Sequence, residues 1–288
     1  MTLLIQVMII VILFTLIVWA AKPKPRNRKR STKKNDLRVK TLMSRKSFHK
    51  SFNNTNYTPN VPNYIDIVNV EREKVKDGER IVGAYMFMRK PLLQRNKQLI
   101  RDGIVKRNAT LRKHSRIPGR RMVRAEAVEV GGQRMALWHI THCIPYRYCL
   151  SDGEVDNLMF MGTAHLNMGA KYDKGYAPAQ KGTKDSCSAR VNFLKDEVNK
   201  RRKNKRGLVL DYPTVDGLPK RYGFVQYSLD DFERLADYLV NSRKDDEFKY
   251  GVECFYTGND LIPDYVVVQM INMTKHKVEF RAKLRNIK

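Results

Sequence analysis

The segment WHITHCIPYR, residues 138–147, contains two histidines, the side chains best suited to acid–base chemistry near neutral pH. A neutral imidazole such as that of His142 can take a proton from water and so act as a general base. The segment NLMFMGTAHLN, residues 157–167, follows and ends at Asn167. An asparagine carbonyl suits Mg²⁺, which prefers oxygen ligands and keeps most of its waters. His142 and Asn167 are therefore a sufficient minimum for metal-assisted cleavage of a phosphodiester bond.

Local patterns predict how these two residues are positioned. The runs RRMVRAEAVEV and QRMALWHITHC flank Gly131-Gly132, which predicts a β-hairpin with His142 at the end of its second strand. Thr163 can cap a helix that carries Asn167. His139 lies on the opposite strand face from His142, and His165 points away from Asn167 on a helix, so both are predicted to be structural.

The remaining elements predict an α+β fold. ERIVGAYMFM (residues 79–88), KYGVECFY, PDYVVVQMINM and KVEFRAKLRN are strand-like, and RKPLLQRNKQLIRDG is a helix closed by Gly103. YSLDDFERLADYLV begins with a capping box formed by Ser228 and Asp231. Because strands and helices do not alternate strictly, a mixed sheet is expected within a domain of residues 64–288. Residues 170–222 are less regular and very basic, as expected of an insertion.

Residues 1–21 contain no charged side chain and match the roughly 20 apolar residues of a membrane-spanning helix. A single-pass anchor is expected, with a cleaved signal peptide as the alternative. Between Lys22 and Lys50 there are thirteen Lys and Arg residues and one acid, Asp36. Residues 22–63 are therefore interpreted as a basic, disordered tether and linker that contacts an anionic membrane surface.

The charge balance predicts a polyanionic partner. The 288 residues carry a net charge of +27, which favours nucleic acid, an anionic membrane surface, or both. Cys143, Cys149, Cys187 and Cys254 form no CxxC pair. This spacing argues against a thiolate zinc site and against a disulfide framework.

Five segments occur in an order that resembles the DNA/RNA non-specific endonuclease family: THCIPYR, NLMFMGTAHLN, DFERLADYL, KYGVECFYTGNDLIPDYVVVQMIN and VEFRAKLRNI. The resemblance is greatest to membrane-anchored bacterial DNA-uptake nucleases and secreted streptococcal nucleases, and it covers roughly residues 80–286. It implies a ββα-metal nuclease-like core with a mixed or antiparallel sheet, preceded by one transmembrane helix. The implied cofactor is Mg²⁺ or another divalent cation, with no small-molecule cofactor.

The resemblance also assigns roles to single residues. His142 matches the general base of the family, and Asn167 matches the asparagine that holds the metal. Asn157 matches the first asparagine of the same segment, which supports the metal site. Glu233 matches a glutamate that helps to place metal-bound water.

The chain departs from the family pattern at the site itself. Where the family has Asp-Arg-Gly before the histidine, this chain has His139-Ile140-Thr141. The family's Arg-Tyr-Arg-Val is replaced by Lys249-Tyr250-Gly251-Val252, so one arginine that faces phosphate is lost. Arg147 is a candidate for the missing catalytic cation.

Candidate nucleic-acid contacts lie outside the histidine segment. The basic run NKRRKNKR is either a solvated loop or a phosphate-binding patch, and it contains Arg201, Arg202, Lys203, Lys205 and Arg206. Lys249, at the position of an arginine of the family, is a further candidate.

Two functions stay open on the sequence. One is a membrane-tethered, Mg²⁺-dependent, non-specific endonuclease of DNA or RNA, and the other is a catalytically impaired relative that only binds nucleic acid at the membrane. The side of the membrane is also open. The positive-inside rule favours a cytoplasmic domain, whereas the resemblance favours an extracellular one.

Overall fold

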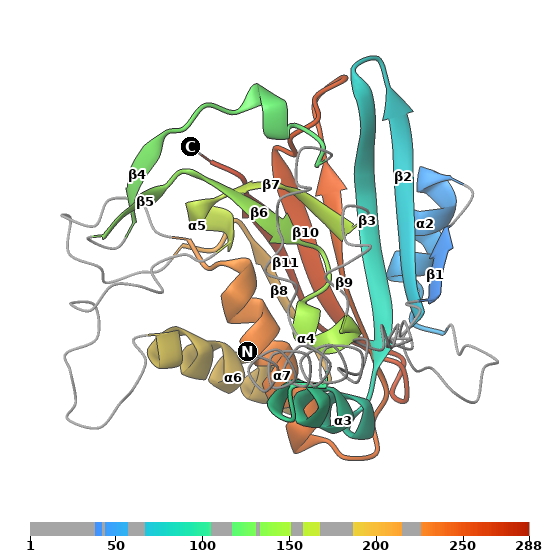
Figure 1. The fold of residues 1–288 in the computed structure, drawn as a ribbon. Helices are drawn as coiled ribbons and strands as arrows, with labels where there is room; N and C mark the ends of the chain where they lie inside the picture. The colour runs from blue at the N-terminus through green and yellow to red at the C-terminus, as the bar shows by residue number, and fades with distance from the viewer. Residues whose placement is uncertain are drawn as a thin grey trace, which may run out of the picture. The chain divides into compact units, whose positions relative to one another are not determined.

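The computed structural model describes residues 38–41, 44–56, 67–104, 117–130, 133–150, 158–167, 187–214 and 226–287 (Figure 1). Within the unit Leu37–Lys288, the main sheet has seven strands in the order β1-β2-β3-β9-β10-β11-β8. These strands are β1 (Arg38–Thr41), β2 (Ile67–Val75), β3 (Gly78–Met88), β8 (Leu208–Asp211), β9 (Phe248–Phe255), β10 (Tyr265–Asn272) and β11 (Lys277–Arg285).

The sheet is antiparallel in its centre and parallel at both edges. β2, β3, β9, β10 and β11 pair in antiparallel fashion, whereas β1 runs parallel to β2 and β8 runs parallel to β11. The predicted α+β class with a mixed sheet is therefore confirmed.

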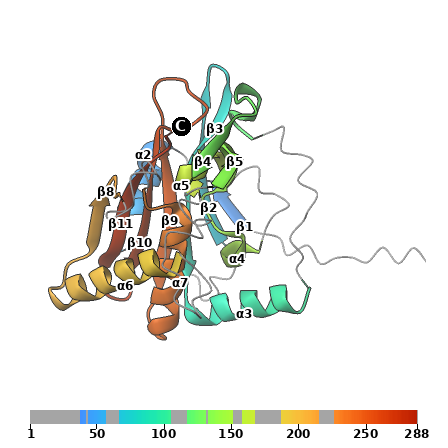
Figure 2. The same cartoon turned by 90° about the vertical axis from the view of Figure 1, so that its left-hand side faces the viewer.

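One face of the sheet carries most of the helices. These are α3 (Lys90–Arg101), α4 (Tyr146–Cys149), α5 (Ala164–Asn167), α6 (Cys187–Lys203) and α7 (Leu229–Ser242). They bury a core on the alternate positions of β9, β10 and β11, where Tyr250, Val268 and Phe280 are fully buried. Figure 2 shows α6 alongside α7 on this face.

Two small antiparallel pairs accompany the main sheet. β4 (Ala127–Val130) pairs with β5 (Gln133–Ala136), and β6 (Trp138–His142) pairs with β7 (Met159–Thr163). The predicted hairpin is thus confirmed for β4 and β5, but its second strand does not run on to His142. The chain leaves that hairpin at Leu137, and His142 ends β6, which pairs with β7 instead.

Local signals in the sequence define the helix ends. The capping box of Ser228 and Asp231 begins α7 as predicted. α3 has Pro91 in its first turn, and Gly103 beyond its end has a φ of +66°. Since glycine adopts positive φ without steric cost, it closes this helix where the sequence predicts.

Two predicted boundaries are corrected. Residues 170–222 contain α6 and the edge strand β8, so the described part of this region belongs to the fold. Residues 22–63 contain β1 and the helix α2 (Arg45–Asn53), and α2 has two buried phenylalanines. The described part of the expected tether is therefore ordered.

Residues 1–21, the expected membrane anchor, lie outside the described residues. In the part of the chain that the structure describes, no helix is both long and apolar enough to cross a membrane.

α2 covers the other face of the sheet, where Phe48 and Phe52 pack with Tyr85 and Phe87. Its first turn is capped by the Ser44 hydroxyl, which accepts a hydrogen bond from the Ser47 amide at 3.2 Å. Two glycines make room for its rings. A Cβ at Gly83 would come within 2.7 Å of the Phe48 ring, and a Cβ at Gly251 within 2.9 Å of the Phe52 ring.

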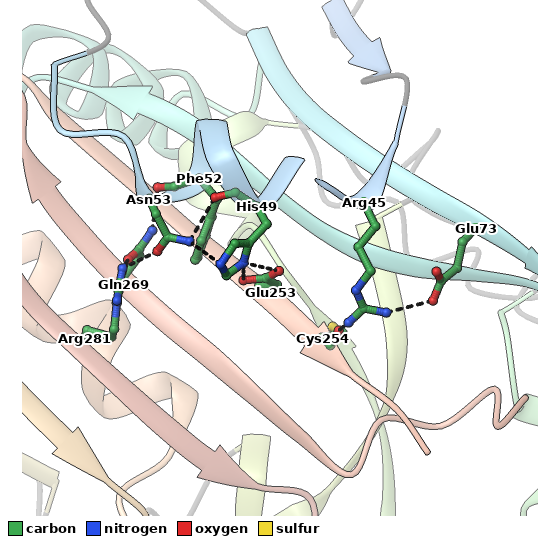
Figure 3. Close-up of polar contacts among 9 residues, drawn as sticks. All are labelled: Arg45, His49, Phe52, Asn53, Glu73, Glu253, Cys254, Gln269 and Arg281. Carbon is green, nitrogen blue, oxygen red and sulfur yellow. Dashed lines mark hydrogen bonds and ion pairs between the residues drawn. The ribbon is translucent and has the colours of Figure 1, made fainter. Parts of the chain in front are cut away.

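Polar contacts complete the docking of α2 (Figure 3). The Nδ1 atom of His49 lies 3.0 Å from the carboxylate of Glu253, which is buried in β9. Gln269 Nε2 donates to the Phe52 carbonyl at 2.6 Å, and Arg281 donates to the Asn53 side chain. Arg45 pairs with Glu73 at 2.9 Å.

Replacing Phe52 by alanine should lower the free energy of unfolding by about 3–5 kcal/mol, because it removes a buried ring and leaves a cavity. Lys50→Ala, on the exposed side of the same helix, is the matched control and should change stability little. Urea unfolding followed by circular dichroism measures both. Equal stability of the two variants would contradict the docking of α2.

Candidate functional site

β6, β7 and α5 form a strand–strand–helix unit on the helical face of the sheet, with α4 in the connection between the two strands. Trp138 pairs with Thr163 and His142 with Met159, and α5 begins directly after β7. The Thr163 hydroxyl accepts a hydrogen bond from the Leu166 amide at 3.3 Å, which confirms the predicted cap. The cap directs the short helix that ends at Asn167.

The histidine that contacts Asn167 is His139. Asn167 Nδ2 lies 3.4 Å from His139 Nδ1, and His139 Nε2 lies 2.9 Å from the Ala136 carbonyl oxygen. A neutral ring that donates from Nε2 and accepts at Nδ1 satisfies both contacts. Burial lowers the pKa of His139, against the opposing effect of the Ala136 bond, and so favours this neutral form. His139 therefore orients the carboxamide of Asn167.

His142 lies at the opposite end of β6 from Trp138. It pairs with Met159, whereas α5 begins next to the Trp138 end of the hairpin. Since a strand rises about 3.4 Å per residue, His142 and His139 are about 10 Å apart along the strand. The ring of His142 is partly buried, with Nε2 enclosed by protein. The expected pair of His142 with Asn167 is thus replaced by a direct contact of His139 with Asn167.

Thr141, in place of the glycine of the family pattern, is accommodated by a glycine on the partner strand. Its side chain is buried, and a Cβ at Gly162 would come within 2.3 Å of the Thr141 hydroxyl. The extra bulk in β6 is therefore matched by the missing side chain in β7.

Arg147 and Glu233, two predicted site residues, lie against each other. Arg147 Nη1 is 3.1 Å from the Glu233 carboxylate, and Arg147 Nε is 3.1 Å from Asp237 on the next turn of α7. The Arg147 guanidinium also lies 4.9 Å from the centre of the Tyr148 ring. Arg147 thus forms ion pairs with two carboxylates. The sequence predicted instead that it would contact the substrate phosphate, and these ion pairs do not provide that role.

Burial gives the Glu233 carboxyl an unusual affinity for a proton. It raises the pKa of Glu233 to about 7, with Asp230 and Asp237 adding to the shift and Arg147 opposing it. Burial lowers the pKa of Arg147, but Tyr148, Glu233 and Asp237 together raise it above its ordinary value. Nearby, the hydroxyl of Tyr250 is buried and makes no hydrogen bond within the described residues. Arg147, Glu233 and Asp237 therefore form a partly buried charge cluster between α4 and α7, in addition to the fully buried pair of Arg190 and Asp231 between α6 and α7.

Asn286 joins the strand–strand–helix unit to the end of the main sheet. Its Oδ1 atom accepts from the Thr163 amide at 2.7 Å, and its Nδ2 atom donates to the carbonyls of Met161 and Pro263 at 3.1 and 2.8 Å. Because Asn286 follows β11 directly, it fixes β7 and α5 relative to the last strand.

A cleft opens beside this junction. It has a volume of about 540 Å³ and is lined by residues that include Met122, Arg124, Trp138, Asp264 and Asn286. This size falls within the usual range of ligand pockets. Trp138 precedes His139 in β6, but successive side chains of a strand point to opposite faces, and neither His139 nor Asn167 is among the residues that line the cleft. A second cleft, of about 600 Å³, is lined by other residues, such as Arg89 and His276.

Lys249 is not a nucleic-acid contact, which corrects the sequence prediction. Its side chain is buried under α2, and its Nζ atom donates to the carbonyls of Ser51 and Asn54 at 2.7 and 2.6 Å. Burial, with Arg281 nearby, lowers the pKa of Lys249 to about 7. Lys249 therefore holds the end of α2.

The basic run of residues 199–206 lies on a helix end and not on a loop. Arg201, Arg202 and Lys203 complete α6, and Lys205 and Arg206 follow in the turn after it. Arg202, Lys203, Lys205 and Arg206 are exposed. Asn157, the second predicted metal residue, lies outside the described residues.

The donors near Asn167 restrict the kind of ion that could bind. Within the described residues, Asn167 makes one hydrogen bond, through Nδ2, which leaves Oδ1 as a possible ligand. No cluster of three or more His, Cys, Asp or Glu side chains suited to a metal occurs in the described part of the chain. This donor set fits an ion that keeps most of its waters, as Mg²⁺ does, and does not fit a metal held by a full protein cage.

Sequence reasoning missed three contributors to this region. His139 was predicted to be structural, and its contact with Asn167 depends on the register of β6 with β7. Asp237 lies four residues after Glu233 on α7, a spacing that could have indicated a shared face. Asn286 had no local signal, because its partners are more than twenty residues away in the chain.

A scan of the chain against protein-family models finds no match, and a search of the curated proteins finds none either.

Glu233→Gln should flatten the dependence of stability on pH. The folded pKa of about 7 exceeds the ordinary value of 4.5, so the folded protein binds more protons between these limits. Wild-type stability should therefore fall as pH rises from 4.5 to 7, by at most on the order of 3 kcal/mol. Urea unfolding at pH 5, 6 and 7 measures the slope.

Asp77→Asn, in the exposed turn between β2 and β3, is the control and should keep the wild-type slope. An unchanged slope in Glu233→Gln would show that Glu233 does not take up a proton on folding.

Proposed function

We propose that the protein is a metal-dependent, non-specific endonuclease of DNA or RNA, tethered to a membrane by its first residues. The observation that carries the proposal is the contact of His139 with Asn167 at the junction of β6 and α5. This contact joins a strand that carries a histidine to a helix that ends at an asparagine, in the order expected of a ββα-metal unit. The resemblance in the sequence supports the same assignment.

The proposed reaction is hydrolysis of a phosphodiester bond. His142 accepts a proton from water, and the water oxygen attacks phosphorus as the bond to the 3′ oxygen breaks. Asn167 would hold the divalent ion through Oδ1, and His139 keeps the carboxamide in that orientation. The ion, when bound, supplies charge stabilisation to the phosphate. His142 and Asn167 lie toward opposite ends of β6, so the attacking water and an ion on Asn167 would together have to span about 10 Å around one phosphate.

The basic surface supports a polyanionic substrate. The net charge is +27, and the exposed end of α6 adds Arg202, Lys203, Lys205 and Arg206. Such a charge distribution raises the local concentration of nucleic acid and makes binding dependent on salt.

The second candidate is a membrane-anchored protein that binds nucleic acid without cleaving it. Two observations favour it: the Asp-Arg pair before His142 is replaced by His139-Ile140, and Arg147 is held by Glu233 and Asp237. In this candidate the same basic surface binds nucleic acid, and the His139–Asn167 contact is structural.

The full-length protein, purified in mild detergent, should nick supercoiled plasmid in Mg²⁺ and not in EDTA. His142→Ala should reduce the rate by about 10²–10⁴-fold, because it removes the general base. His276→Ala removes a histidine at the Thr55 contact and is the matched control. Agarose electrophoresis over time measures the rates. A folded protein that binds DNA but nicks it in no divalent metal would support the second candidate.

His139→Phe should raise the Mg²⁺ concentration needed for half-maximal nicking, because Asn167 loses the partner that orients it. The Mg²⁺ requirement of His139→Phe should rise about 10–100-fold, as is typical when a residue that orients a metal ligand is lost. Asn167→Ala should raise the requirement further. The maximal rate of His139→Phe at saturating Mg²⁺ should stay within about tenfold of wild type. A Mg²⁺ titration of the initial rate distinguishes these effects. A large loss of maximal rate with unchanged Mg²⁺ dependence would instead make His139 the general base.

A further inference from the structure

We infer that the face of the sheet around β11 is a docking track for a single-stranded polynucleotide. The basic-aromatic track combines cations on β11 with aromatic rings on β8, β9 and β10, or next to them; its members are Arg281, Lys283, Arg285, Tyr212, Phe255 and Tyr265. The inference rests on the proposed function, because it names the form in which a polynucleotide approaches the same site.

The three cations lie in a line on one face of β11. Phe280, Ala282 and Leu284 point into the core, so Arg281, Lys283 and Arg285 point to the opposite face. Residues two apart on a strand are about 7 Å apart. This spacing is comparable to that of neighbouring phosphates along a single strand, so successive cations can meet successive phosphates.

Aromatic rings hold two of these cations in place. Lys283 Nζ lies 4.3 Å from the centre of the Tyr265 ring and 4.6 Å from that of Tyr212. The guanidinium of Arg285 lies 4.3 Å from the centre of the Tyr212 ring. Long basic side chains ordered in this way lose less conformational entropy when they bind an anion.

The rings are partly exposed, but their faces already have partners. Lys283 lies over Tyr265 and Arg45 lies over Phe255, so an unpaired base stacks on either ring only by displacing one of these cations. Phe255 and Tyr265 are directly opposite each other on β9 and β10, with ring centres 4.6 Å apart and an angle of 7° between the rings. Phe255, Tyr265 and Tyr212 are all partly exposed. Sheets that bear aromatic and basic side chains are a common form of single-strand binding surface, since every base has an aromatic face.

This part of the sheet face is open within the described residues. Val209 on the edge strand β8 pairs with Arg281 and is 60% exposed. α2 covers the neighbouring part of the same face and reaches the track at Arg281, which donates to Asn53. The boundary of the helix thus marks one end of the track.

One carboxylate lies beside the track, because Asp211 on β8 is directly opposite Lys283 on β11. Among the described residues, Lys283 and Arg285 make no ion pair with an acid. A hydrogen bond with the Tyr212 hydroxyl raises the pKa of Lys283. The charge of Asp211 also raises this pKa, but it has the smallest effect of the groups involved. Glu253 on the same face is buried against His49. The surface therefore presents cations to a polyanion.

The other end of the track lies at the end of β11, on the opposite face of the sheet from β6, β7 and α5. Arg285 is followed by Asn286, which binds β7 at Met161 and Thr163 and lines the cleft beside Trp138. A polynucleotide strand that lies along β11 must therefore turn around the end of the sheet to reach this cleft, whose lining also includes Glu126, Asp260 and Asp264. A duplex would turn its bases away from Tyr265 and Phe255 and so gain little from the rings.

The test measures binding of the full-length protein to fluorescein-labelled dT20 by anisotropy in EDTA, where metal-dependent cleavage is stopped. The double variant Lys283→Gln/Arg285→Gln should bind dT20 about tenfold more weakly. Its plot of log affinity against log salt should be less steep by about 1.4, because two phosphate contacts are lost at about 0.7 each. Tyr265→Leu should weaken binding of dT20 about 5-fold or more without a similar loss for a 20-bp duplex.

Lys74→Gln/Lys76→Gln removes the same charge from the exposed turn between β2 and β3 and should bind as the wild type does. Equal binding of dT20 by the two double variants would overturn the inference. If Tyr265→Leu weakened binding of the duplex as much as binding of dT20, the inference would also be overturned. The same holds if Lys283→Gln/Arg285→Gln bound vesicles of phosphatidylglycerol more weakly but bound dT20 as the wild type does.

Nicking and dT20 binding by the same variants distinguish failure of the nuclease proposal from failure of the track. Track-dependent binding of dT20 with no nicking by the wild type in Mg²⁺ would reject the nuclease and keep the track. Wild-type nicking with unchanged dT20 binding by Lys283→Gln/Arg285→Gln would keep the nuclease and reject the track.

Discussion

The fold depends on covering both faces of β9, the central strand. Seven of its eight residues, Phe248 to Cys254, are buried, so neither face of this strand can be left to solvent. One face is apolar and joins the main core, but the other presents Lys249, Gly251 and Glu253. Burying this polar face requires a partner for each charge. α2 supplies backbone carbonyls for the lysine, a histidine for the glutamate and a phenylalanine ring for the space above the glycine.

Elements with strong local patterns could be predicted from the sequence. The alternation in β9, β10 and β11 and the capping box of α7 each depend on residues close in the chain. α2 and β8 could not be predicted in the same way, because α2 is stabilised by the sheet face and β8 by pairing with β11. The segment of α2 is short and basic, and β8 has only the four residues LVLD, so neither is distinctive until its distant partners are known.

In the candidate site too, some features follow from local sequence and others depend on contacts between distant residues. The cap on α5 by Thr163 and the placement of His142 at a strand end follow from local sequence. The contact of His139 with Asn167 follows from strand register, and the cluster of Arg147, Glu233 and Asp237 from the packing of α4 against α7. Local sequence therefore predicts where these side chains lie along the chain, whereas the partner of each side chain required the tertiary structure.

Gly251 is the point at which the central strand meets a neighbour in the sheet and a helix above it. A Cβ at this position would meet the Ala84 carbonyl oxygen of β3 at 2.6 Å and the Phe52 ring of α2 at 2.9 Å. Because the first of these contacts is with backbone, removing α2 alone would not make room for a side chain. The close approach of β3 and the close approach of α2 therefore both depend on the absence of a side chain at residue 251.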